Sequence, residues 1–405
     1  METLILENKS EDLRLAGELL RAGRLVAIPT ETVYGLAGNG LNEAAVRQIY
    51  EVKGRPEVKA LSLMVPDSNA MEHYCESVPK AAYALAEKYW PGPLTIILKS
   101  KDLVPEINRA GGETVGLRCP DHPMTLELLR ACGLPLAAPS ANPSGAPSPK
   151  TAGEVSAYFD GAIDGIIDGG PCGIGTESTI IDLSKTPYSI LREGALAEEE
   201  VFAALRDSVT LIGITGGSGG GKTTALRVLA AKGALILDCD EIYHELTVSS
   251  ADMRGELTDR FGNVYDGAVL DRKKLGTVVF SDSGALADLN RITHKYVAAA
   301  LDGRLTEFAR NGGTLAAIDA IELLRIPHAK RTVVNVAVTA PLEDRVQRLM
   351  LRDGISEEYA RQRIAAQKSD EYFAENCDAV LHNDGTREEF EQKCFEYFTE
   401  VLSNV

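Results

Sequence analysis

The chain has 405 residues, 44% of them apolar and 25% charged, the balance of a soluble globular protein with room for two or three cores. Its net charge of −17 argues against nucleic-acid binding by the general surface, because contacts to phosphate need a basic face. No apolar run reaches the roughly 18 residues of a membrane span, and the acidic start does not resemble a signal peptide. The seven cysteines include no C-x-x-C pair, which indicates free thiols in a reducing cytoplasm and argues against a zinc site or a disulfide framework.

Short strands and helices alternate irregularly through the first half of the chain. Apolar runs bounded by turns predict the strands, and apolar residues at helical spacing predict the helices. Thr151 with Glu154 resembles a capping box that opens a further short helix. This mixture predicts a layered domain of helices and mixed strands. The predicted strands are 25–28, 61–65, 94–98, 114–118, 136–138, 163–167, 178–182 and 189–192, and the predicted helices are 11–20, 43–50, 79–88, 123–132 and 198–205.

Three segments of this half have the composition of binding loops. Hydroxyl side chains and a glycine fill residues 29–36, where the first of these strands ends. Lys53, Arg55 and Lys59 put three cations beside the next strand; if the segment is extended, Lys53 and Arg55 share one face and could clamp a polyphosphate. The turn 138–145 is again rich in hydroxyls. Taken alone, the first two are better explained as a plain turn and a solvated basic turn.

Six short motifs occur in a specific order over about residues 4–206. They read Pro-Thr-Glu-Thr-Val-Tyr-Gly-Leu, Lys-Gly-Arg-Pro, Gly-Leu-Arg-Cys-Pro, Ala-Pro-Ser-Ala-Asn, Glu-Ser-Thr-Ile and Ile-Leu-Arg-Glu-Gly. This set closely resembles the Sua5/YrdC family, the L-threonylcarbamoyladenylate synthases. The resemblance implies a twisted open α/β sheet with a large central cavity. It also implies that L-threonine, bicarbonate and ATP give threonylcarbamoyl-AMP and pyrophosphate, which would make the downstream tRNA threonylcarbamoyl transferase a partner.

The same resemblance implies roles for individual residues. Lys53 and Arg55 belong to the Lys-x-Arg signature and would stabilise charge on departing pyrophosphate. Met64 departs from the family, because many long relatives have a histidine there, and the C-terminal domain of long-form Sua5 is replaced by a different domain. The threonine pocket would comprise Thr32, Arg118, Ala138 and Ser178, with Arg118 gripping the carboxylate, and the ATP contacts would be Arg55, Lys59, Thr114, Ser140, Ser148 and Arg192.

A glycine-rich loop opens the second half. Residues 216–223 fit the pattern G-x-x-x-x-G-K-[ST], with an apolar run, 211–214, before it and a helix-prone run, 225–231, after it. Glycines let several backbone N–H groups point at one anion, and the following helix adds its positive end. Lys222 can reach the outer phosphates of ATP, and Thr223 offers a hydroxyl to Mg²⁺. The alternative is a glycine-rich loop that binds no nucleotide.

Strands alternate with helices through the rest of this half, which predicts a parallel, doubly wound sheet. Asp238 and Asp240 follow a strand and should face the ligand crevice. Two helices rich in arginine, 342–352 and 357–367, could form a cationic lid over ATP, although a solvated helical hairpin explains any single arginine better. The predicted strands begin at 209 and cover 234–237, 314–318, 333–338 and 378–381, and the remaining helices are 253–261, 272–280, 286–309 and 387–402.

Further motifs over about 210–402 make this half resemble dephospho-CoA kinase. They are Ile-Thr-Gly-Gly, Asp-Cys-Asp-Glu-Ile, Arg-Asp-Gly-Ile-Ser, Ala-Ala-Gln and Cys-Asp-Ala-Val-Leu-His-Asn-Asp-Gly. The resemblance implies transfer of the γ-phosphate of ATP to the 3′-hydroxyl of dephospho-CoA. Ser218, Cys239 and Lys295 depart from the family, and the stretch 319–323 matches its acceptor motif only loosely. The implied roles are Asp240 as general base, Gly219, Gly220, Gly221, Lys222, Thr223 and Thr224 as the ATP loop, and Arg352 as the lid arginine.

The sequence therefore predicts a cytoplasmic bifunctional enzyme with a synthase domain over 1–207 and a kinase domain over 208–405. Two alternatives stay open. The second domain could bind nucleotide and regulate the synthase without kinase turnover, or the first domain could be an RNA-binding module, against which the acidic balance counts.

Overall fold

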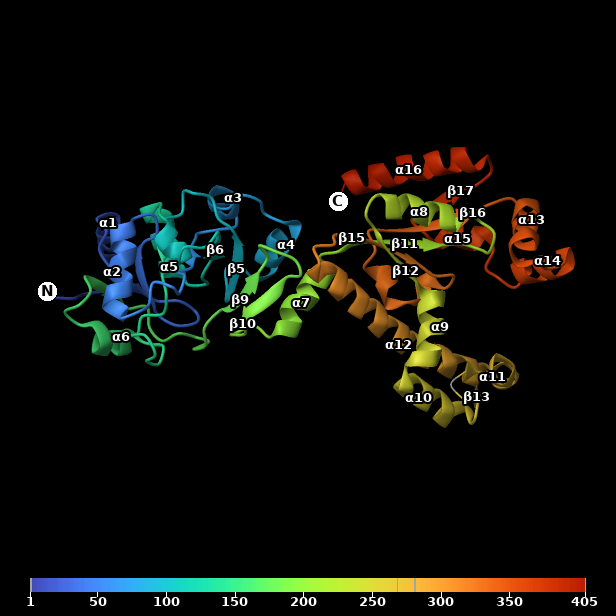
Figure 1. The fold of residues 1–405 in the computed structure, drawn as a ribbon, viewed down its shortest axis with the longest axis horizontal. Coiled ribbons are helices and arrows are strands. Elements are labelled where there is room, and N and C mark those ends of the chain that lie inside the picture. Colours follow the sequence, from blue (N-terminus) through green and yellow to red (C-terminus); the bar gives the residue numbers. More distant parts are fainter. Residues whose placement is uncertain (1, 268, 280–281, 405) are drawn as a thin grey trace. The chain divides into compact units, whose positions relative to one another are not determined.

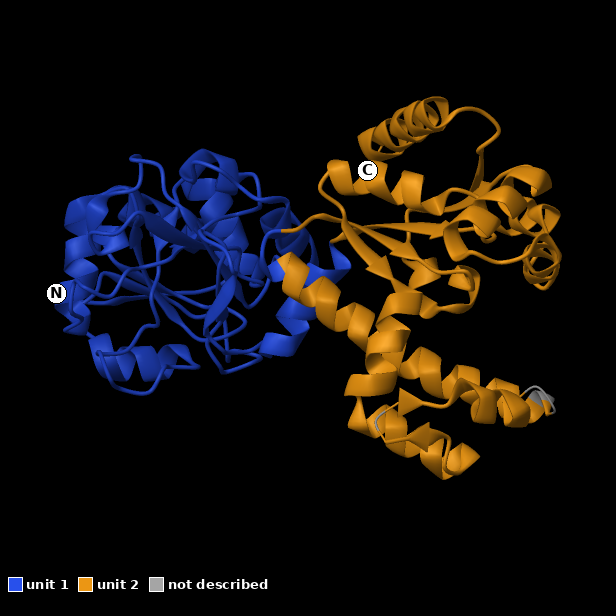
Figure 2. Ribbon diagram, turned by 45° about the vertical axis from the view of Figure 1, so that its right-hand side comes forward, with its two compact units in different colours: residues 1–208, 310–312 blue, residues 209–309, 313–405 orange. Residues whose placement is uncertain are grey.

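A computed structural model describes residues 2–267, 269–279 and 282–404 of the chain. It divides into two compact units, residues 1–208 with 310–312 and residues 209–309 with 313–405, drawn in two colours in Figure 2. Each unit has its own sheet (Figure 1). Each also has its own apolar core. We describe them in turn.

The first unit is built on a mixed sheet. Its described strands follow the order β1-β8-β2-β3-β7-β4-β6-β5-β9-β10, in which β2 pairs antiparallel with β3 and β5 pairs parallel with β9. This agrees with the open α/β sheet expected from the sequence. The strands are β1 (Leu4–Leu6), β2 (Val26–Ile28), β3 (Gly35–Asn39), β4 (Leu63–Met64), β5 (Leu94–Lys99), β6 (Thr114–Arg118), β7 (Leu136–Ala137), β8 (Gly165–Ile167), β9 (Thr179–Asp182) and β10 (Ser189–Arg192).

Amphipathic helices cover this sheet. The first, α1, buries Leu13, Ala16 and Leu20 at helical spacing and packs them with Leu128 of α5 in the apolar core. Burying such leucines is worth roughly 1.5–3 kcal/mol each, so this contact anchors both helices to the sheet. The helices are α1 (Ser10–Arg21), α2 (Glu43–Lys53), α3 (Ala70–Tyr74), α4 (Lys80–Tyr89), α5 (Pro123–Cys132), α6 (Ala152–Phe159), α7 (Glu198–Asp207) and the short η1 (Glu106–Arg109).

Two local details differ from the expectation. The loop expected over 29–36 ends in strand β3, which was not predicted because its sequence, Gly-Leu-Ala-Gly-Asn, lacks a β-branched residue. Helix α2 continues to Lys53 and is ended by Gly54, whose φ of +59° is left-handed. The segment is therefore helical at Lys53, and the period-two argument for Lys53 and Arg55 is wrong.

The second unit has a five-stranded sheet in its described residues, with the order β12-β15-β11-β16-β17 and every pair parallel. This is the predicted parallel, doubly wound sheet. Its central strand, β11, buries Leu211, Ile212 and Ile214, as expected for a strand covered on both faces. The strands are β11 (Thr210–Thr215), β12 (Leu235–Asp238), β15 (Leu315–Asp319), β16 (Val334–Thr339) and β17 (Ala379–His382), and β13 (Tyr265–Asp266) pairs separately with β14 (Val269–Leu270).

Helices lie on both faces of this sheet. On one face α8 and α16 lie side by side (Figure 1). Phe390 and Phe398 of α16 belong to the apolar core, together with Leu226 and Leu229 of α8. Helices α9 and α15 were not predicted, and the predicted end of α11 at Phe280 lies outside the described residues. Among the described helices, none combines the length and the apolar character needed to cross a membrane. The helices are α8 (Lys222–Ala231), α9 (Cys239–Ser249), α10 (Ala251–Phe261), α11 (Arg272–Val279), α12 (Ser283–Arg310), α13 (Leu342–Asp353), α14 (Glu357–Ala365), α15 (Asp370–Asn376) and α16 (Arg387–Ser403), with two short 3₁₀ turns, η2 (Leu323–Arg325) and η3 (Pro327–Lys330).

Candidate active sites

The sheet of the first unit encloses a cavity of about 210 Å³. Met64 and Arg118, register partners in strands β4 and β6, both line it. Its wall combines apolar, hydroxyl and guanidinium groups, the mixture expected of a site for a polar metabolite with anionic parts. Of the residues implied for threonine or ATP, those lining the cavity are Arg55, Arg118, Ala138, Ser140, Ser178 and Arg192.

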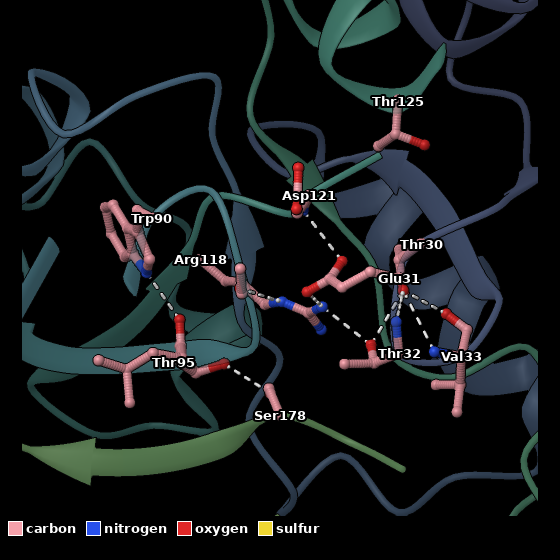
Figure 3. A network of polar contacts seen from close by, with 12 residues as sticks. Thr30, Glu31, Thr32, Val33, Trp90, Thr95, Arg118, Asp121, Thr125 and Ser178 are labelled. Atoms are coloured by element: carbon pink, nitrogen blue, oxygen red, sulfur yellow. Dashed lines mark hydrogen bonds and ion pairs between the residues drawn. The ribbon is translucent and has the colours of Figure 1, made fainter. Parts of the chain in front are cut away.

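Arg118 is the centre of a polar network beside the cavity (Figure 3). Its Nη2 donates to Oε1 of Glu31 at 2.6 Å and to Oγ1 of Thr32 at 2.8 Å. Its Nε donates to the carbonyl oxygen of Gly92 at 3.3 Å, and the second carboxylate oxygen of Glu31 accepts from the N–H of Asp121 at 3.0 Å. The Arg118 and Glu31 side chains are only 7% and 12% exposed, so they form a buried, hydrogen-bonded ion pair that fixes the guanidinium.

Thr32 is held by its own turn. Oγ1 of Thr30 accepts from the N–H groups of Thr32 and Val33, at 3.2 Å each, and lies 2.9 Å from Oγ1 of Thr32 (Figure 3). Both threonines are almost completely buried. A hydroxyl that bonds to its own backbone makes a turn at the end of a strand, which explains why the segment after β2 is rich in hydroxyls. The Thr32 hydroxyl thus contacts Arg118, which lines the cavity, while Thr32 is not among the described residues that line it.

Ser178 connects three strands at the cavity. Its Oγ lies 2.8 Å from Oγ1 of Thr95 on β5, as Figure 3 shows. Its carbonyl oxygen accepts from Nε and Nη2 of Arg192 on β10, at 3.0 and 2.7 Å. This paired contact orients the guanidinium plane of Arg192, because both nitrogens point to one acceptor.

Lys53 and Arg55 have different surroundings. Lys53 is 3% exposed, and its ammonium donates to the carbonyl oxygens of Ser140 and Asn142. Burial, assisted by the charge of Arg55, lowers the pKa of Lys53 to about 8. Arg55 instead lines the cavity, and its Nη2 donates to the carbonyl oxygen of Ala60 at 3.1 Å. Lys53 thus holds the turn that carries Ser140, whereas Arg55 faces the cavity.

The remaining implied ATP contacts are not among the cavity-lining residues of the described chain. Lys59 is exposed, and Thr114 begins strand β6 at the end away from Arg118. Oγ of Ser148 donates to Oε1 of Glu177 at 2.6 Å, a bond that lowers the pKa of Glu177, which does line the cavity. Ser148 therefore touches the site through Glu177.

In the second unit the phosphate loop joins β11 to α8, as the motif predicted. Gly216, Gly219 and Gly221 have φ of +125°, +80° and +114°. A Cβ on Gly216 would lie 2.2 Å from the carbonyl oxygen of Val338, so only glycine fits there. Nζ of Lys222 donates to the carbonyl oxygen of Gly216 at 3.3 Å, which connects the amine at the end of the loop to its first residue.

A buried carboxylate lies beside this loop at the end of β15. Oδ1 of Asp319 is 3.9 Å from Nζ of Lys222 and accepts no hydrogen bond from the described residues. Asp319 is the register partner of Asp238 on β12, so the two carboxylates end adjacent parallel strands. Burial raises the pKa of Asp319 to about 6; Lys222 opposes the rise, and Asp238 and Asp240 add to it.

Side chains from later in the chain hold the loop from outside. In a trans peptide the C=O of one residue and the N–H of the next point in opposite directions. Holding the loop carbonyls on the outside therefore turns the N–H groups of Gly219 and Gly221 to the other side, as anion binding requires. The donors are Arg345 Nε to Ser218 O at 3.0 Å, Arg348 Nη1 to Gly219 O at 3.1 Å and Asn383 Nδ2 to Gly220 O at 2.9 Å.

Asp238 and Asp240 have different surroundings in the structure. Oδ1 of Asp238 accepts from the N–H groups of Asp240 and Glu241, at 2.9 and 3.1 Å, and so caps α9. Asp240 lies in the first turn of α9 with an exposed side chain. Arg352, the expected lid arginine, pairs with Asp353 at 2.7 Å and is 59% exposed.

Two family profiles match the chain, one for each unit. The Sua5/YciO/YrdC profile, described as "Telomere recombination", matches residues 18–194, and the profile described as "Dephospho-CoA kinase" matches residues 210–389. The threonylcarbamoyl-AMP synthase of Pyrococcus abyssi is 46% identical over 189 residues, which are 47% of this chain and 56% of the relative. A Methanocaldococcus jannaschii relative, whose name gives the same activity provisionally, is 37% identical over 47% of this chain and 89% of its own length.

The dephospho-CoA kinase of Geobacter sulfurreducens is 35% identical over 188 residues, which are 46% of this chain and 95% of the relative. The chain belongs to both families. It spans only about half the length of the first synthases it matches, 56% of the P. abyssi protein and 58% of the Bacillus subtilis protein.

Several residues of these two family sites were missed in the sequence. In the Sua5/YrdC unit they are Glu31 and Thr95; Glu31 lies inside the recognised motif, and its position next to Thr32 was an available signal. In the dephospho-CoA kinase unit Asp319 ends a predicted strand as Asp238 does, so it could have been found by analogy. Gln367 ends the Ala-Ala-Gln motif and Arg345 lies in the arginine-rich helix 342–352, but neither signal indicated that both residues contact Ser218 of the loop.

Proposed function

We propose that the chain is a bifunctional enzyme whose domains are residues 1–207 and 208–405. The first forms threonylcarbamoyl-AMP and pyrophosphate from L-threonine, bicarbonate and ATP. The second transfers the γ-phosphoryl group of ATP to the 3′-hydroxyl of dephospho-CoA. Membership of both families supports this, and the observation that carries it is that each unit has its own anion site, a cavity lined by three arginines and a phosphate loop.

In the synthase domain the cavity residues divide the work between two substrates. Arg118, fixed by Glu31, binds the threonine carboxylate, and Ser178 and Ala138 line the pocket beside it. Arg55 and Arg192 bind the triphosphate and stabilise negative charge on the departing pyrophosphate. No side chain becomes covalently attached, because the threonine amine and bicarbonate supply the nucleophiles.

The product of the synthase domain is a mixed anhydride that must be consumed by transfer to tRNA. The partner is therefore the enzyme that transfers threonylcarbamoyl groups to tRNA. The net charge of −17 makes tight tRNA binding by this chain itself unfavourable.

In the kinase domain the phosphate loop binds ATP, and a carboxylate serves as the general base. Within the loop from Gly219 to Thr224, the N–H groups of Gly219 and Gly221 and the ammonium of Lys222 hold the β- and γ-phosphates, whereas the N–H groups of Gly220 and Thr224 donate to loop carbonyl oxygens. Asp240, exposed beside the strand edge, accepts the proton of the ribose hydroxyl as it attacks the γ-phosphorus. Positioning and charge neutralisation contribute most of the remaining rate enhancement.

The donor set at the loop fits Mg²⁺. Thr223 is the exposed second residue of α8, and Asp319 has a buried oxygen that accepts no hydrogen bond from the described residues. Oxygen ligands of this kind suit a hard divalent cation. Thr223 and Asp319 would hold it, and the ion would neutralise charge on the phosphates.

The test feeds the purified chain each substrate set separately. L-Threonine, bicarbonate and ATP should give AMP and pyrophosphate, and dephospho-CoA with ATP should give CoA and ADP. AMP formation that does not depend on threonine would contradict the first assignment. Absence of CoA from a chain that binds ATP would contradict the second and favour a regulatory nucleotide module.

A further inference from the structure

Gln367 joins the phosphate loop of the second unit to the helical hairpin formed by α13 and α14. It follows the last residue of α14, Ala365, by two positions. Its Oε1 accepts from the N–H of Ser218 at 2.8 Å, and its Nε2 donates to Oγ of Ser218 at 2.8 Å. One amide group therefore satisfies both the backbone and the side chain of a single loop residue.

The serine side chain at position 218 makes this pair of hydrogen bonds possible. With an aliphatic side chain at this position, which the family resemblance makes usual, the backbone N–H could still donate to Oε1 of Gln367, but Nε2 would have no acceptor on this residue. Ser218 is 8% exposed, so water replaces neither bond cheaply. The loop N–H that Gln367 occupies precedes Gly219 and Gly221, whose N–H groups we assign to the phosphates.

Arg345 reinforces the same residue from the other helix of the hairpin. Its Nε donates to the carbonyl oxygen of Ser218 at 3.0 Å, and Nη1 reaches Asp370 at 3.4 Å. Arg345 is 6% exposed, and its guanidinium packs so closely on the loop that a Cβ on Gly217 would lie 2.0 Å from Nη2. Every polar backbone atom of Ser218 is thus held by the hairpin or the segment after it.

The hairpin itself is one packed body. Val346 and Leu349 of α13 and Ala360 and Ile364 of α14 form its buried core. Because both helices lead to contacts with Ser218, a displacement of the hairpin would strain or break those contacts.

We propose that Gln367 is a positioning residue that holds the phosphate loop in the shape that accepts the triphosphate of ATP and ties that shape to the position of the hairpin. This deepens the kinase assignment and rests on it. Gln367 touches no reacting atom; it acts through Ser218. Its loss should weaken ATP binding and leave the affinity for dephospho-CoA unchanged.

The experiment measures the dissociation constant of ATP for the full chain by titration, with the synthase site disabled by Arg55→Ala in every sample. The variants are Gln367→Met, Ser218→Ala and the double variant. The matched control is Gln362→Ala, an exposed residue of α14 whose Nε2 donates to Oε1 of Glu358 at 3.5 Å. Circular dichroism checks that each variant is folded.

A neutral hydrogen bond is worth about two- to twelvefold in an equilibrium constant. Gln367→Met removes two such bonds and should raise the ATP dissociation constant roughly tenfold or more, while Ser218→Ala should raise it about two- to fivefold and Gln362→Ala should have no effect. In the double variant Ser218→Ala should add nothing to Gln367→Met, since its partner is already gone. In steady state, KM for ATP should rise and KM for dephospho-CoA should not.

Three results decide between the proposals. An unchanged dissociation constant in Gln367→Met, or effects that multiply in the double variant, would overturn the positioning role alone. If Gln367→Met does not fold, Ser218→Ala and its control still test the contact. A chain with intact Gln367 that binds no ATP would overturn the kinase assignment itself.

Discussion

The ammonium of Lys222 lies 3.9 Å from a carboxylate oxygen of Asp319, and the two side chains are only 16% and 15% exposed. Lys222 begins α8 and Asp319 ends β15, so the amine of the phosphate loop has its counter-charge at the carboxyl edge of the sheet. This is the edge at which parallel α/β sheets bind their ligands. Both residues belong to the second unit, so a single substitution of either one should affect the kinase site and not the synthase site.

Lys222→Ala should abolish CoA formation and leave threonine-dependent AMP formation within twofold of the wild type. The reason is that Lys222 belongs to the second unit only and is the cation of its loop. Both activities are measured on one preparation. The control is Lys232→Ala, at the end of the same helix, where the lysine bonds Thr399. Equal loss of both activities would mean a shared nucleotide site.

Asp319→Asn should change the pH dependence of stability. Burial raises the pKa of the wild-type carboxyl from 3.8 to about 6, so the folded state holds its proton more tightly than the unfolded state does. The stability that this provides is complete below about pH 4 and is lost as pH rises through about 6. The asparagine variant does not titrate, so its unfolding free energy relative to wild type should rise over that window by at most about 3 kcal/mol.

Hydrogen exchange of the β15 amides at pH 4.5 and 7.5 measures this difference for the second unit alone. A difference between variant and wild type that does not change with pH would contradict it.

Asp240→Asn should lower kcat for CoA formation by about 10²–10⁴, the usual contribution of a general base. The ATP dissociation constant should barely change, because the loop is untouched. Asp238→Asn serves as the comparison, since asparagine caps helices as well as aspartate does and α9 should be retained. A large loss in Asp238→Asn with near-normal turnover in Asp240→Asn would give the role to Asp238.

Arg55→Ala should abolish AMP formation without altering the melting temperature of the first unit, because Arg55 lines the cavity and is not part of the core. The unit can be followed selectively by fluorescence, since Trp90 is the one tryptophan in the chain. Arg47→Ala, an exposed arginine paired with Glu57, is the matched control. AMP formation within a few-fold of wild type would exclude Arg55 as a triphosphate ligand.

Lys53→Met should lower both activity and stability of the first unit. Methionine fills the space but leaves the carbonyls of Ser140 and Asn142 without their buried donor, a cost of roughly 1–3 kcal/mol. The melting temperature by Trp90 fluorescence should fall, in contrast to Arg55→Ala. An inactive Lys53→Met with unchanged melting temperature would instead give Lys53 a direct part in the reaction.

The sequence predicted what is encoded locally. The apolar run Leu211–Ile214 predicted a strand, and the glycine pattern after it predicted a loop that joins this strand to a helix, both of which the structure has. Lys53 was placed wrongly because α2 continues to this lysine and only then is ended by the left-handed Gly54, so the lysine side chain is buried. The partners of Ser218 could not be predicted, because Arg345 lies 127 positions away and Gln367 lies 149 positions away.

The strand order of the second unit has a consequence for how the chain is made. The central strand, β11, emerges from the ribosome about 100 residues before its neighbours β15 and β16, since these begin at 315 and 334. Until then an apolar strand has two unpaired edges, which is a template for aggregation. Folding must then close loops of this length, so high contact order makes the unit slow to fold. The nascent β11, which leads directly into the phosphate loop, therefore has no partner strand in its own sheet until β15 has been synthesised.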